Sequence, residues 1–461
     1  MIEILKSTLS SFDGMDYGEI RFHERIATGI SIRQAELETL AHNTYSGVGV
    51  RALYQGGWGF SATSRIDANE IKKAINDACA AAKIASVGKN NKNVKLAKAA
   101  LAKGKFSPII NDPLTNHTLE EKLDLVKNTE SKLRNASSLI QSARVSYIER
   151  LERKFIINTD GAECEVIDSK PEFIIFAVGA DGKDMVESFE GVGVTGGWQD
   201  LFGRKTPDEF IEKVIKRIEL LLKAGYPKGE KTTVILDPGL VGLIAHEAIG
   251  HTVEADFVSA GAITKNKIGH RVASDLVTLF DSGSEGTAGG TILVDDEGVI
   301  ARKVLIIQNG ILKSYLHNRQ SAAEYGVEPT GNARAFEYAN EPIIRMRNTG
   351  IMPGNLTLEE IIDSTPNGYL LKGAKGGQAD ANAEFMFGVQ EAYKITNGKI
   401  GECYRGVTIS GQAFDVLMSV DAISQDFQWD MGYGHCGKWQ PAKVDGGGPY
   451  LRCQAIIGGR Q

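Results

Sequence analysis

Alternation of apolar and polar residues is the pattern that most limits how this chain can fold. It runs through residues 17–33 and again through residues 47–63, and a two-residue period is typical of strands with one buried face. Asn-Gly pairs at 309–310 and 397–398 lie between alternating segments farther along the chain. An Asn-Gly pair in that setting predicts a tight hairpin turn. We therefore expect much antiparallel sheet, above all in the C-terminal half.

Composition supports a sheet-rich globular protein. The 461 residues include 52 Gly but only 12 Pro, a balance that favours tight turns over low-complexity linkers. Hydrophobic residues make up 42% and charged residues 24%, which excludes a wholly disordered chain. At roughly 100–200 residues per domain, a chain of this length is expected to contain two to four domains or lobes.

A well-marked helix divides the chain near its middle. Thr206 and Glu209 have the spacing of a capping box around a proline, and Gly225 is the predicted C-cap. The polar stretch that follows is the predicted boundary. We expect an α+β fold of two lobes: a mixed helix-and-strand domain over residues 1–225, and a largely antiparallel β-rich domain over residues 231–461 that carries the motif described below.

Charge and cysteine content limit the classes of partner and the cellular compartment that we expect. The formal net charge of −6 argues against a dedicated nucleic-acid-binding protein, and the basic stretch at residues 89–105 is expected to be a solvated loop or helix face. None of the five cysteines forms a Cys-x-x-Cys pair. With no signal-peptide pattern and no apolar run of about 18 residues, we expect a cytoplasmic protein with reduced thiols and no membrane span.

The most informative motif is H-E-x-x-x-H, at residues 246–251. It is one residue longer than the zincin motif H-E-x-x-H, in which both histidines share one helix face. At about 100° per residue, His246 and His251 point roughly 140° apart on a regular α-helix. Both rings reach one metal ion only if a π-type bulge widens the helix or the helix ends between them. Gly250 makes such a distortion low in energy.

The surroundings of the motif favour a catalytic metal. Apolar residues precede His246, so the imidazoles are expected to enter a water-poor cavity, where neutral imidazole is a good zinc ligand. A catalytic zinc site has three protein ligands and an open position for water. Glu247 is then the predicted general base that takes a proton from this water. The alternative is that the two histidines are ordinary core or surface residues, which we consider the weaker interpretation.

A third ligand is required, and the residues alone leave several candidates. Glu254 follows His251 by three positions and is expected on the same helix face, and Asp256 is a weaker candidate. Cys436 lies among glycines at residues 432–438, a setting typical of an exposed loop. On pattern alone, Glu254 and Cys436 are equally good candidates.

These motifs resemble those of one family, the TldD/PmbA metalloproteases, once described as modulators of DNA gyrase. The resemblance extends over nearly the whole chain, and its most specific part is the combination of HEAIGH with the late Cys-Gly-Lys. The motifs that carry it lie at residues 47–51, 237–239, 246–251, 295–298, 309–313, 329–332, 376–378 and 434–438. The basic stretch at 89–105 departs from the family pattern.

The resemblance implies a ligand set and an assembly. It implies that His246, His251 and Cys436 hold the metal and that Glu247 is the catalytic base, which leaves Glu254 a supporting or structural role. Zn²⁺ is the expected metal and Fe²⁺ the alternative, since a thiolate with two imidazoles suits zinc but not uniquely. Family members work as homodimers or as heterodimers with a metal-less paralogue, on unfolded peptides such as precursor leaders and antitoxins.

We therefore expect a metal-dependent peptidase that hydrolyses unfolded or extended peptides with loose sequence preference, because Gly-rich strands can pair with a substrate backbone by β-addition. The substrate-binding residues are not predicted. The alternative is a regulatory binding protein of the gyrase-modulator type with a structural metal, although the sequence has no helix-turn-helix, zinc finger or basic stripe for it. A third interpretation is a non-peptidase hydrolase with the same metal-activated water; the sequence has no Walker-type loop for phosphoester chemistry.

Overall fold

A computed structural model describes residues 1–87 and 94–459 of the chain. It is a mixed α/β protein in which strands, with 42% of the residues, outweigh helices, with 25%, so the predicted sheet-rich mixed fold is confirmed at this level. Among the described residues, no helix combines the length and hydrophobicity needed to cross a membrane. The first part of the basic stretch, residues 89–93, lies outside the described residues.

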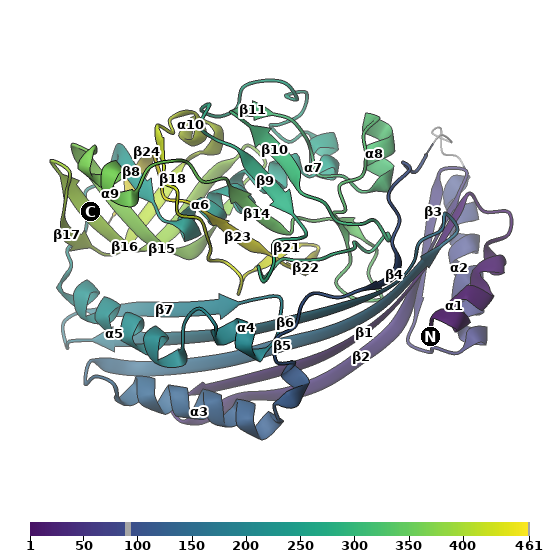
Figure 1. Ribbon diagram of the computed structural model, residues 1–461, viewed down its shortest axis with the longest axis horizontal. Coiled ribbons are helices and arrows are strands. Elements are labelled where there is room, and N and C mark those ends of the chain that lie inside the picture. The colour runs from purple at the N-terminus through teal and green to yellow at the C-terminus, as the bar shows by residue number, and fades with distance from the viewer. Residues whose placement is uncertain (88–93, 460–461) are drawn as a thin grey trace.

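The first half of the chain builds one strongly curved, seven-stranded sheet (Figure 1). Its strands pair in the order β3-β2-β1-β5-β6-β4, with β7 added beside β6. Neighbours are antiparallel except β4, which runs parallel to β6. The strands are β1 (Tyr17–Arg33), β2 (Glu36–Tyr54), β3 (Gly57–Thr63), β4 (Lys103–Phe106), β5 (Ile140–Asn158), β6 (Glu163–Ala180) and β7 (Met185–Gly193).

The alternating segments of the sequence lie in this sheet. Residues 17–33 form β1 as predicted. Residues 47–63 form a hairpin of β2 and β3 rather than one strand, because Gln55 and Gly56 have φ values of 44° and 79° and reverse the chain. The described part of the basic stretch is an irregular segment that leads into β4, and backbone hydrogen bonds fasten it to the C-terminal half, as from Ala102 N–H to the Gly298 carbonyl at 2.8 Å.

Helices cover one face of the sheet, with α1 and α2 at one end and α3, α4 and α5 at the other (Figure 1). Capping boxes begin α3 at Thr118 and α5 at Thr206. The predicted C-cap at Gly225 is wrong: α5 ends at Lys223, and Ala224 already has an extended conformation, with ψ of 142°. The helices, with two short 3₁₀ turns, are α1 (Ile2–Thr8), η1 (Leu9–Phe12), α2 (Ala68–Ser86), η2 (Leu114–Asn116), α3 (Leu119–Asn135), α4 (Trp198–Phe202) and α5 (Pro207–Lys223).

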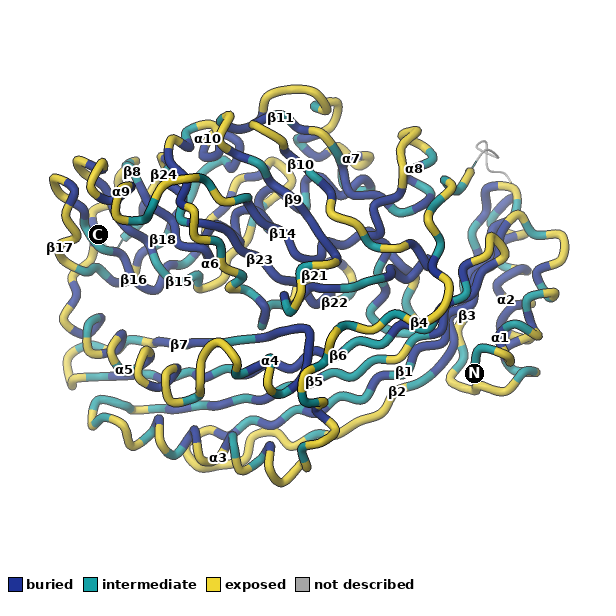
Figure 2. The backbone as a smooth tube through the Cα atoms, in the orientation of Figure 1, coloured by how far each residue is buried: buried dark blue, intermediate teal, exposed yellow. Residues whose placement is uncertain are grey.

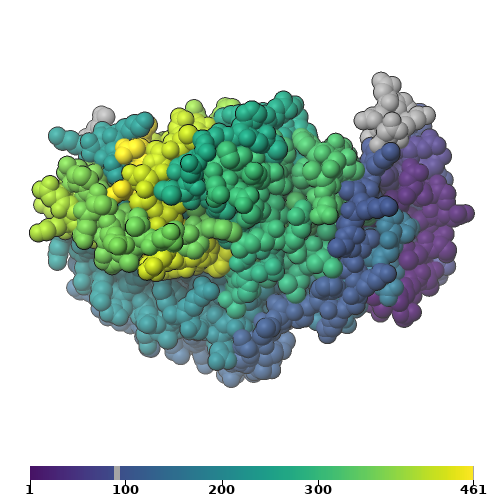
Figure 3. Space-filling model, turned by 45° about the horizontal axis from the view of Figure 1, so that its top comes forward, coloured from purple at the N-terminus to yellow at the C-terminus, as the bar shows by residue number. Residues whose placement is uncertain are grey.

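The two faces of this sheet differ in chemistry. Along β1, Ile20 and Phe22 belong to the apolar core with α2, and Arg21, His23 and Arg25 point to the opposite face because strand side chains alternate. On that face Arg21 and Arg25 donate to backbone carbonyls of the C-terminal half. Strand β1 is therefore buried along most of its length (Figure 2), and the two halves of the chain lie against each other along the molecule (Figure 3).

The C-terminal half contains a closed ring of strands and a second sheet. The ring runs β15-β8-β24-β18-β16 and closes because β15 also pairs with β16, while β17 and β19 attach to its rim. In the ring, β15 pairs with β8 in parallel, and in the second sheet β14 (Asn348–Ile351) pairs with β23 (Asp445–Gly448) in parallel. The other pairings in these two sheets are antiparallel. The ring strands and their additions are β8 (Glu230–Leu236), β15 (Asn367–Ala379), β16 (Glu384–Thr396), β17 (Lys399–Tyr404), β18 (Val407–Gln412), β19 (Ala422–Ile423) and β24 (Leu451–Gly458).

The second sheet has the order β11-β10-β9-β14-β23-β20, and two ribbons, β12 with β13 and β21 with β22, stand apart. These strands are β9 (Leu279–Ser282), β10 (Val304–Gln308), β11 (Ile311–Leu312), β12 (Ala333–Arg334), β13 (Ile343–Ile344), β14 (Asn348–Ile351), β20 (Gln428–Trp429), β21 (His435–Lys438), β22 (Gln440–Lys443) and β23 (Asp445–Gly448). The helical elements of this half are α6 (Pro238–Leu243), η3 (Ile244–Gly250), η4 (His251–Val253), α7 (Ala255–Ala260), α8 (Arg319–Tyr325), α9 (Leu358–Asp363) and α10 (Ala413–Met418).

Both predicted Asn-Gly hairpins are present. Asn309 and Gly310 have φ of 47° and 77°, and Asn397 and Gly398 have φ of 51° and 73°. Two successive left-handed residues make the mirror-image turn that matches strand twist. These turns join β10 to β11 and β16 to β17.

Candidate metal centre

The helical segment that carries the histidines starts directly after a buried strand. Strand β8 ends at Leu236, and the Asp237 side chain accepts a hydrogen bond from Leu240 N–H at 2.9 Å, which caps α6 as aspartate does at helix starts. A Cβ on Gly242 would lie 2.5 Å from the carbonyl carbon of Gly446. The absence of a side chain there lets α6 pack directly on the backbone of β23, so the segment has a fixed position in the core.

A π-helical turn then brings the two histidines together. Residues Ile244–Gly250 form the π-helix η3, and the backbone N–H of His251 donates to the carbonyl of His246. This bond spans five residues instead of four, so residues five apart come to lie above one another. The two rings have centroids 5.4 Å apart. The widened helix that the five-residue spacing predicts is confirmed.

Gly250 contributes space rather than an unusual backbone conformation. Its φ and ψ are −56° and −46°, which any residue adopts. A Cβ at this position would lie 1.9 Å from the sulfur of Met346. The prediction that glycine eases the backbone distortion is therefore replaced by a packing reason: the π turn passes too close to Met346 for a side chain.

Cys436 reaches the histidines from the β21–β22 ribbon, 185 positions away in the sequence. Its Sγ lies 3.1 Å from Nε2 of His251. Donor atoms of His246, His251 and Cys436 all lie within 4.8 Å of one another. The expected exposed loop is a short strand instead, in which Cys436 is only 4% exposed, because alternate residues of β21 face the π turn.

The donor set fits a metal ion. His246 is 1% exposed, and neither of its ring nitrogens has a hydrogen-bond partner. A buried polar group without a partner is rare and costly unless something else satisfies it. Two imidazoles and a thiolate are ligands that zinc accepts at a site with three protein ligands. The residues present therefore fit a metal site in two ways: their donor atoms are ones that zinc accepts, and the ring nitrogens of His246 have no other partner among the described residues.

Glu254 lies behind His251 and outside the group of three donors. Its Oε2 is 2.9 Å from Nδ1 of His251, and it is fully buried. Because Nδ1 is engaged there, Nε2 is left to face Cys436. Asp256 also lies outside the group of donors. The two carboxylates that sequence patterns left as candidate ligands thus occupy a second layer.

Lys438 joins this second layer to the ribbon that carries Cys436. Its Nζ lies 3.1 Å from Oε2 of Glu254, 2.8 Å from Oδ1 of Asp256 and 3.0 Å from the carbonyl of Ile344. Cys436 and Lys438 are two positions apart and share one face of β21. The Cys-Gly-Lys motif is the only sequence signal for this lysine, and it predicts no role for the side chain.

Arg345 is a second positioning residue that sequence patterns did not reveal. Its Nη2 donates to the Cys436 carbonyl at 2.7 Å, and its side chain is almost fully buried. The two residues are 91 positions apart, so no local pattern could have linked them. Beside them, Trp439 at the tip of the ribbon is 84% exposed and its ring centroid lies 6.1 Å from that of Phe257.

Glu247 lies on the open side of the cluster. Its side chain is 26% exposed, and its Oε2 is 3.7 Å from Nε2 of His251. It is the least buried residue of η3. The carboxylate is therefore partly open to solvent and close to one of the three donors.

Charge coupling favours the thiolate form of Cys436. Burial alone would raise the pKa of this thiol, but the charge of the nearby His246 and the hydrogen bond and charge of His251 lower it to about 4. Burial alone would lower the pKa of His251, but its hydrogen bonds to Cys436 and Glu254 raise it to about 10. The pKa of His246 is also raised, by the Cys436 charge against the effect of burial. Without metal, the cluster holds a thiolate beside imidazolium.

Comparison with known proteins gives the family. Three family models match in succession: PmbA/TldA metallopeptidase domain 1 over residues 18–82, the central domain over residues 112–222 and the C-terminal domain over residues 229–458. Together they span most of the chain, and the C-terminal model includes all the residues of the cluster.

Full-length relatives agree. A metalloprotease of Methanocaldococcus jannaschii is 36% identical over 451 residues, which are 96% of this chain and 97% of the relative. A zinc metalloprotease TldD homolog of Saccharolobus solfataricus is 31% identical over 97% of both chains. The crystal structure of TldE from Thermococcus kodakarensis has the same fold, with a TM-score of 0.79 and 17% identity over 98% of this chain and 99% of that one. The chain belongs to the PmbA/TldD family of metallopeptidases.

Proposed function

We propose that this protein is a metal-dependent peptidase that hydrolyses unfolded or extended peptides with loose sequence preference. The observation that carries the proposal is the convergence of His246, His251 and Cys436, whose donor atoms lie within 4.8 Å of one another, with the Glu247 carboxylate on the open side. Three protein donors with a carboxylate beside them are the arrangement of a catalytic rather than a structural zinc site.

In this proposal, a ring nitrogen of His246, Nε2 of His251 and Sγ of Cys436 hold the ion. Zn²⁺ is the proposed metal, with Fe²⁺ as the alternative, and zinc is named for one relative. Glu254 accepts a hydrogen bond from His251 Nδ1 and so fixes the tautomer and the orientation of the ring. Lys438 and Arg345 hold the ribbon in place so that the thiolate stays in range.

The bound metal would supply Lewis acidity, which polarises a peptide carbonyl and lowers the pKa of a water molecule. Glu247 carries out the proton transfers: its carboxylate takes a proton from water and later passes it to the nitrogen of the leaving amine. Because His251 Nδ1 is bonded to Glu254, this ring does not compete for that proton. The apolar residues before His246 exclude further water from the site.

Burial of the donors supports unfolded peptides as substrates. His246 and Cys436 are 1% and 4% exposed, so the convex surface of a folded protein does not reach them. An extended strand has a narrow cross-section and presents its carbonyls to the side. Recognition through backbone hydrogen bonds, as in β-addition, would give the loose sequence preference.

The proposal also covers the domain boundaries and the assembly of the protein. We place a domain boundary between residues 225 and 231, with domains over 1–225 and 231–461. It is supported by an apolar core formed only by residues of the second range, separate from two cores formed only by residues of the first. The family resemblance supports a cytoplasmic homodimer or a heterodimer with a metal-less paralogue.

The test is a peptidase assay with matched substrates. Purified protein loaded with zinc is offered an unfolded polypeptide, the same polypeptide in folded form, and simple carboxylic esters. Cleavage of the unfolded form alone, lost in Glu247→Gln with the metal retained, is the expected result. A Glu247→Gln variant with full peptidase activity would contradict the proposed role. Absence of any hydrolysis, with metal bound, would favour a regulatory binding protein, and cleavage of esters alone would favour another hydrolase.

A further inference from the structure

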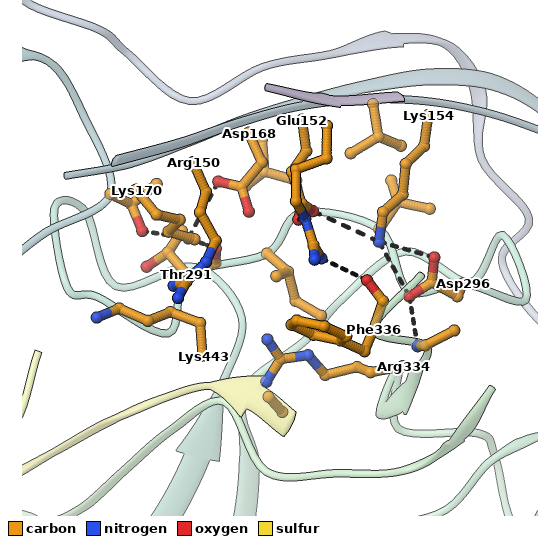
Figure 4. A pocket seen from close by; sticks show the side chains of 18 of the residues that line it. Arg150, Glu152, Lys154, Asp168, Lys170, Thr291, Asp296, Arg334, Phe336 and Lys443 are labelled. Atoms are coloured by element: carbon orange, nitrogen blue, oxygen red, sulfur yellow. Dashed lines mark hydrogen bonds and ion pairs between the residues drawn. The ribbon is translucent and has the colours of Figure 1, made fainter. Parts of the chain in front are cut away.

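A cavity lies between the charged face of the N-terminal sheet and the β21–β22 ribbon. Strands β5 and β6 contribute one wall, and residues 291–296, 334–336 and 441–443 contribute the other. Figure 4 shows Glu152, Asp168 and Lys154 reaching in from the sheet, and Arg334 and Lys443 from the opposite side. The cavity has a volume of about 70 Å³, enough for several water molecules or one small polyatomic ion but not for a length of polypeptide.

We infer that this cavity is a binding site for a small oxyanion, a carboxylate or a phosphate, held between Arg334 and Lys443 of the C-terminal half and Arg150 of β5. The inference does not depend on the peptidase activity. It rests on the charges that line the cavity, on which of them are paired, and on their burial.

Cations outnumber anions around the cavity by two to one. Among the described residues that line it, six carry a positive side chain and three a negative one. The cations are Arg25, Arg150, Lys154, Lys170, Arg334 and Lys443. The anions are Glu152, Asp168 and Asp296.

Three of the cations are each paired with one of the three anions. Arg25 lies 2.6 Å from Glu152, and Lys154 lies 2.9 Å from Asp296. Lys170 lies 3.0 Å from Asp168. These pairs account for all the carboxylates of the lining.

Among the described residues, the other three cations have one carboxylate at ion-pair distance between them. More distant carboxylates also act on two of them: Asp445 on Lys443, and Asp168, Asp281 and Asp296 on Arg334. Arg150 and Lys443 share one carboxylate outside the lining, Glu172, at 3.0 Å and 2.9 Å. Within the described part of the chain, Arg334 has no ion pair with a carboxylate, and its Nη1 donates to the Met346 carbonyl at 2.6 Å. Lys443 is 8% exposed, and its Nζ makes no hydrogen bond of good geometry.

Of these three cations Lys443 is buried, Arg334 is half-buried and the Arg150 side chain is 22% exposed. A surplus of positive charge that is partly withdrawn from water is unfavourable unless an anion compensates it. The pKa values of the groups agree with this surplus. Burial lowers the pKa of Arg334 to about 10 and, with further repulsion from Arg150, that of Lys443 to about 8. The pKa of His435, which also lines the cavity, falls to about 3 through burial and repulsion by Lys443, Arg150 and Arg334.

The donor types match an oxyanion. A guanidinium offers a planar fork of N–H groups that bonds two oxygens of a carboxylate or phosphate, and an ammonium adds a compact charge. Arg334 contributes the guanidinium N–H groups that are left beside its bond from Nη1 to the Met346 carbonyl. Lys443 contributes the ammonium, and Arg150 contributes a second guanidinium whose Nη1 already pairs with Glu172. Soft or cationic ligands would find no donor atoms of the right kind among these groups.

The experiment measures anion binding to the full-length protein loaded with zinc. Isothermal titration calorimetry at constant ionic strength uses inorganic phosphate in one arm, and N-acetyl-dialanine beside its C-terminal amide in the other. We expect one saturable site per chain for at least one oxyanion. Binding of phosphate alone would identify free phosphate as the ligand. Binding of the dipeptide acid, but not of its amide, would identify the carboxyl end of a peptide.

Variants locate the site. Arg334→Met should weaken binding by about tenfold or more, because charge-assisted hydrogen bonds are lost. Arg153→Met is the matched control: Arg153 is on the same strand as Arg150, but its side chain is 53% exposed and pairs with Glu165 outside the cavity. Arg334→Lys keeps the charge but loses the fork, so it should bind with intermediate affinity even if Arg334→Met folds poorly.

Metal removal separates this site from the metal centre. Binding that persists in metal-free protein and remains sensitive to Arg334 supports the cavity. Absence of saturable binding in the wild type, equal weakening by Arg153→Met, or loss of binding with the metal would each overturn the inference. None of these results bears on cleavage of peptides, so this inference and the proposed function fail separately.

Discussion

The backbone N–H of His251 donates to the carbonyl of His246, and this single bond across five residues turns an unfavourable spacing into a shared site. In a regular α-helix the two imidazoles would point roughly 140° apart. In the π turn their centroids lie 5.4 Å apart, and Cys436 approaches to 3.1 Å from His251 Nε2. Each prediction below follows from this arrangement or from what holds it.

Removal of the thiol should remove the metal. Cys436→Ala leaves two imidazoles, and we expect the metal affinity to fall by more than the ~10–100-fold that loss of a supporting group costs. Elemental analysis of purified protein, with competition by a chelator, measures it. Cys403→Ala, at a half-buried cysteine outside the group of donors, is the control and should keep the metal content of the wild type. Equal metal content in Cys436→Ala would exclude the thiolate as a ligand.

Glu247→Gln should separate metal binding from catalysis. The amide cannot take a proton from water, so kcat should fall by about 10²–10⁴-fold, with little change in metal content. Steady-state kinetics on an unfolded peptide, beside elemental analysis, check both. Glu212→Gln removes an exposed carboxylate on α5 and should leave kcat unchanged. A Glu247→Gln variant that loses its metal would assign Glu247 a role in binding instead.

The second layer should tune the affinity for metal. Glu254→Gln weakens the acceptor at His251 Nδ1, and we expect about 10–100-fold weaker metal binding. Asp256→Asn is the matched control, because Asp256 contacts the same Lys438 Nζ but not His251. Chelator competition at fixed pH gives both affinities. Equal effects of the two substitutions would mean that Glu254 acts through Lys438 rather than through the histidine.

Gly250→Ala should destabilise the protein through Met346. The added Cβ would lie 1.9 Å from the Met346 sulfur, and overpacking of a core costs typically ~1–3 kcal/mol. Urea unfolding of Gly250→Ala, Met346→Ala and the double variant forms a cycle. We expect the double variant to be less destabilised than the sum of the single variants. Additive effects would mean that the glycine is needed for a reason other than space.

Stability of the metal-free protein should depend on pH through the thiolate–imidazolium pair. The pKa of Cys436 falls from 9.0 to about 4, so its contribution to stability grows as pH rises from about 4 to 9. The pKa of His251 rises from 6.5 to about 10, so its contribution is complete below 6.5 and is lost as pH rises to about 10. The free energy of unfolding should therefore rise between pH 4 and 6.5 and fall above pH 9. Between these values the loss from His251 offsets the gain from Cys436, and the raised pKa of His246 adds a further loss.

The measurement compares chemical unfolding of metal-free wild type and Cys436→Ala at each pH. Because Cys436→Ala removes only the thiolate, the difference between the two free energies reports the titration of Cys436 and the part of the histidine pKa shifts that the thiolate causes. We expect this difference to follow the described profile. A difference that is constant from pH 4 to pH 10 would show that no such ion pair forms in the absence of metal.

Local patterns of the sequence predicted local backbone structure well. The alternating residues 17–33 form β1, the Asn-Gly pairs form hairpin turns, and Thr206 caps α5. The five-residue spacing of the histidines required a widened helix, and η3 supplies it. Each of these features depends on residues a few positions apart, whose geometry is set by backbone sterics and nearby hydrogen bonds. The Gly225 cap was wrong because the chain passes directly from α5 into an extended segment.

Only the tertiary structure decided which third group meets the histidines. Sequence patterns favoured Glu254, three positions after His251, and the distant Cys436 equally. Residue type and spacing do not reveal how close two residues lie when 185 positions separate them. Helix α6 packs against the glycines of β23. Lys438 bonds to Glu254, and Arg345 bonds to the Cys436 carbonyl. Together these contacts place the sulfur beside His251 Nε2 and the Glu254 carboxylate behind the ring. The sequence by itself determined the widened turn of the helix. Contacts between distant segments determined which side chain lies opposite this turn, since those contacts exist only once the distant segments are folded together.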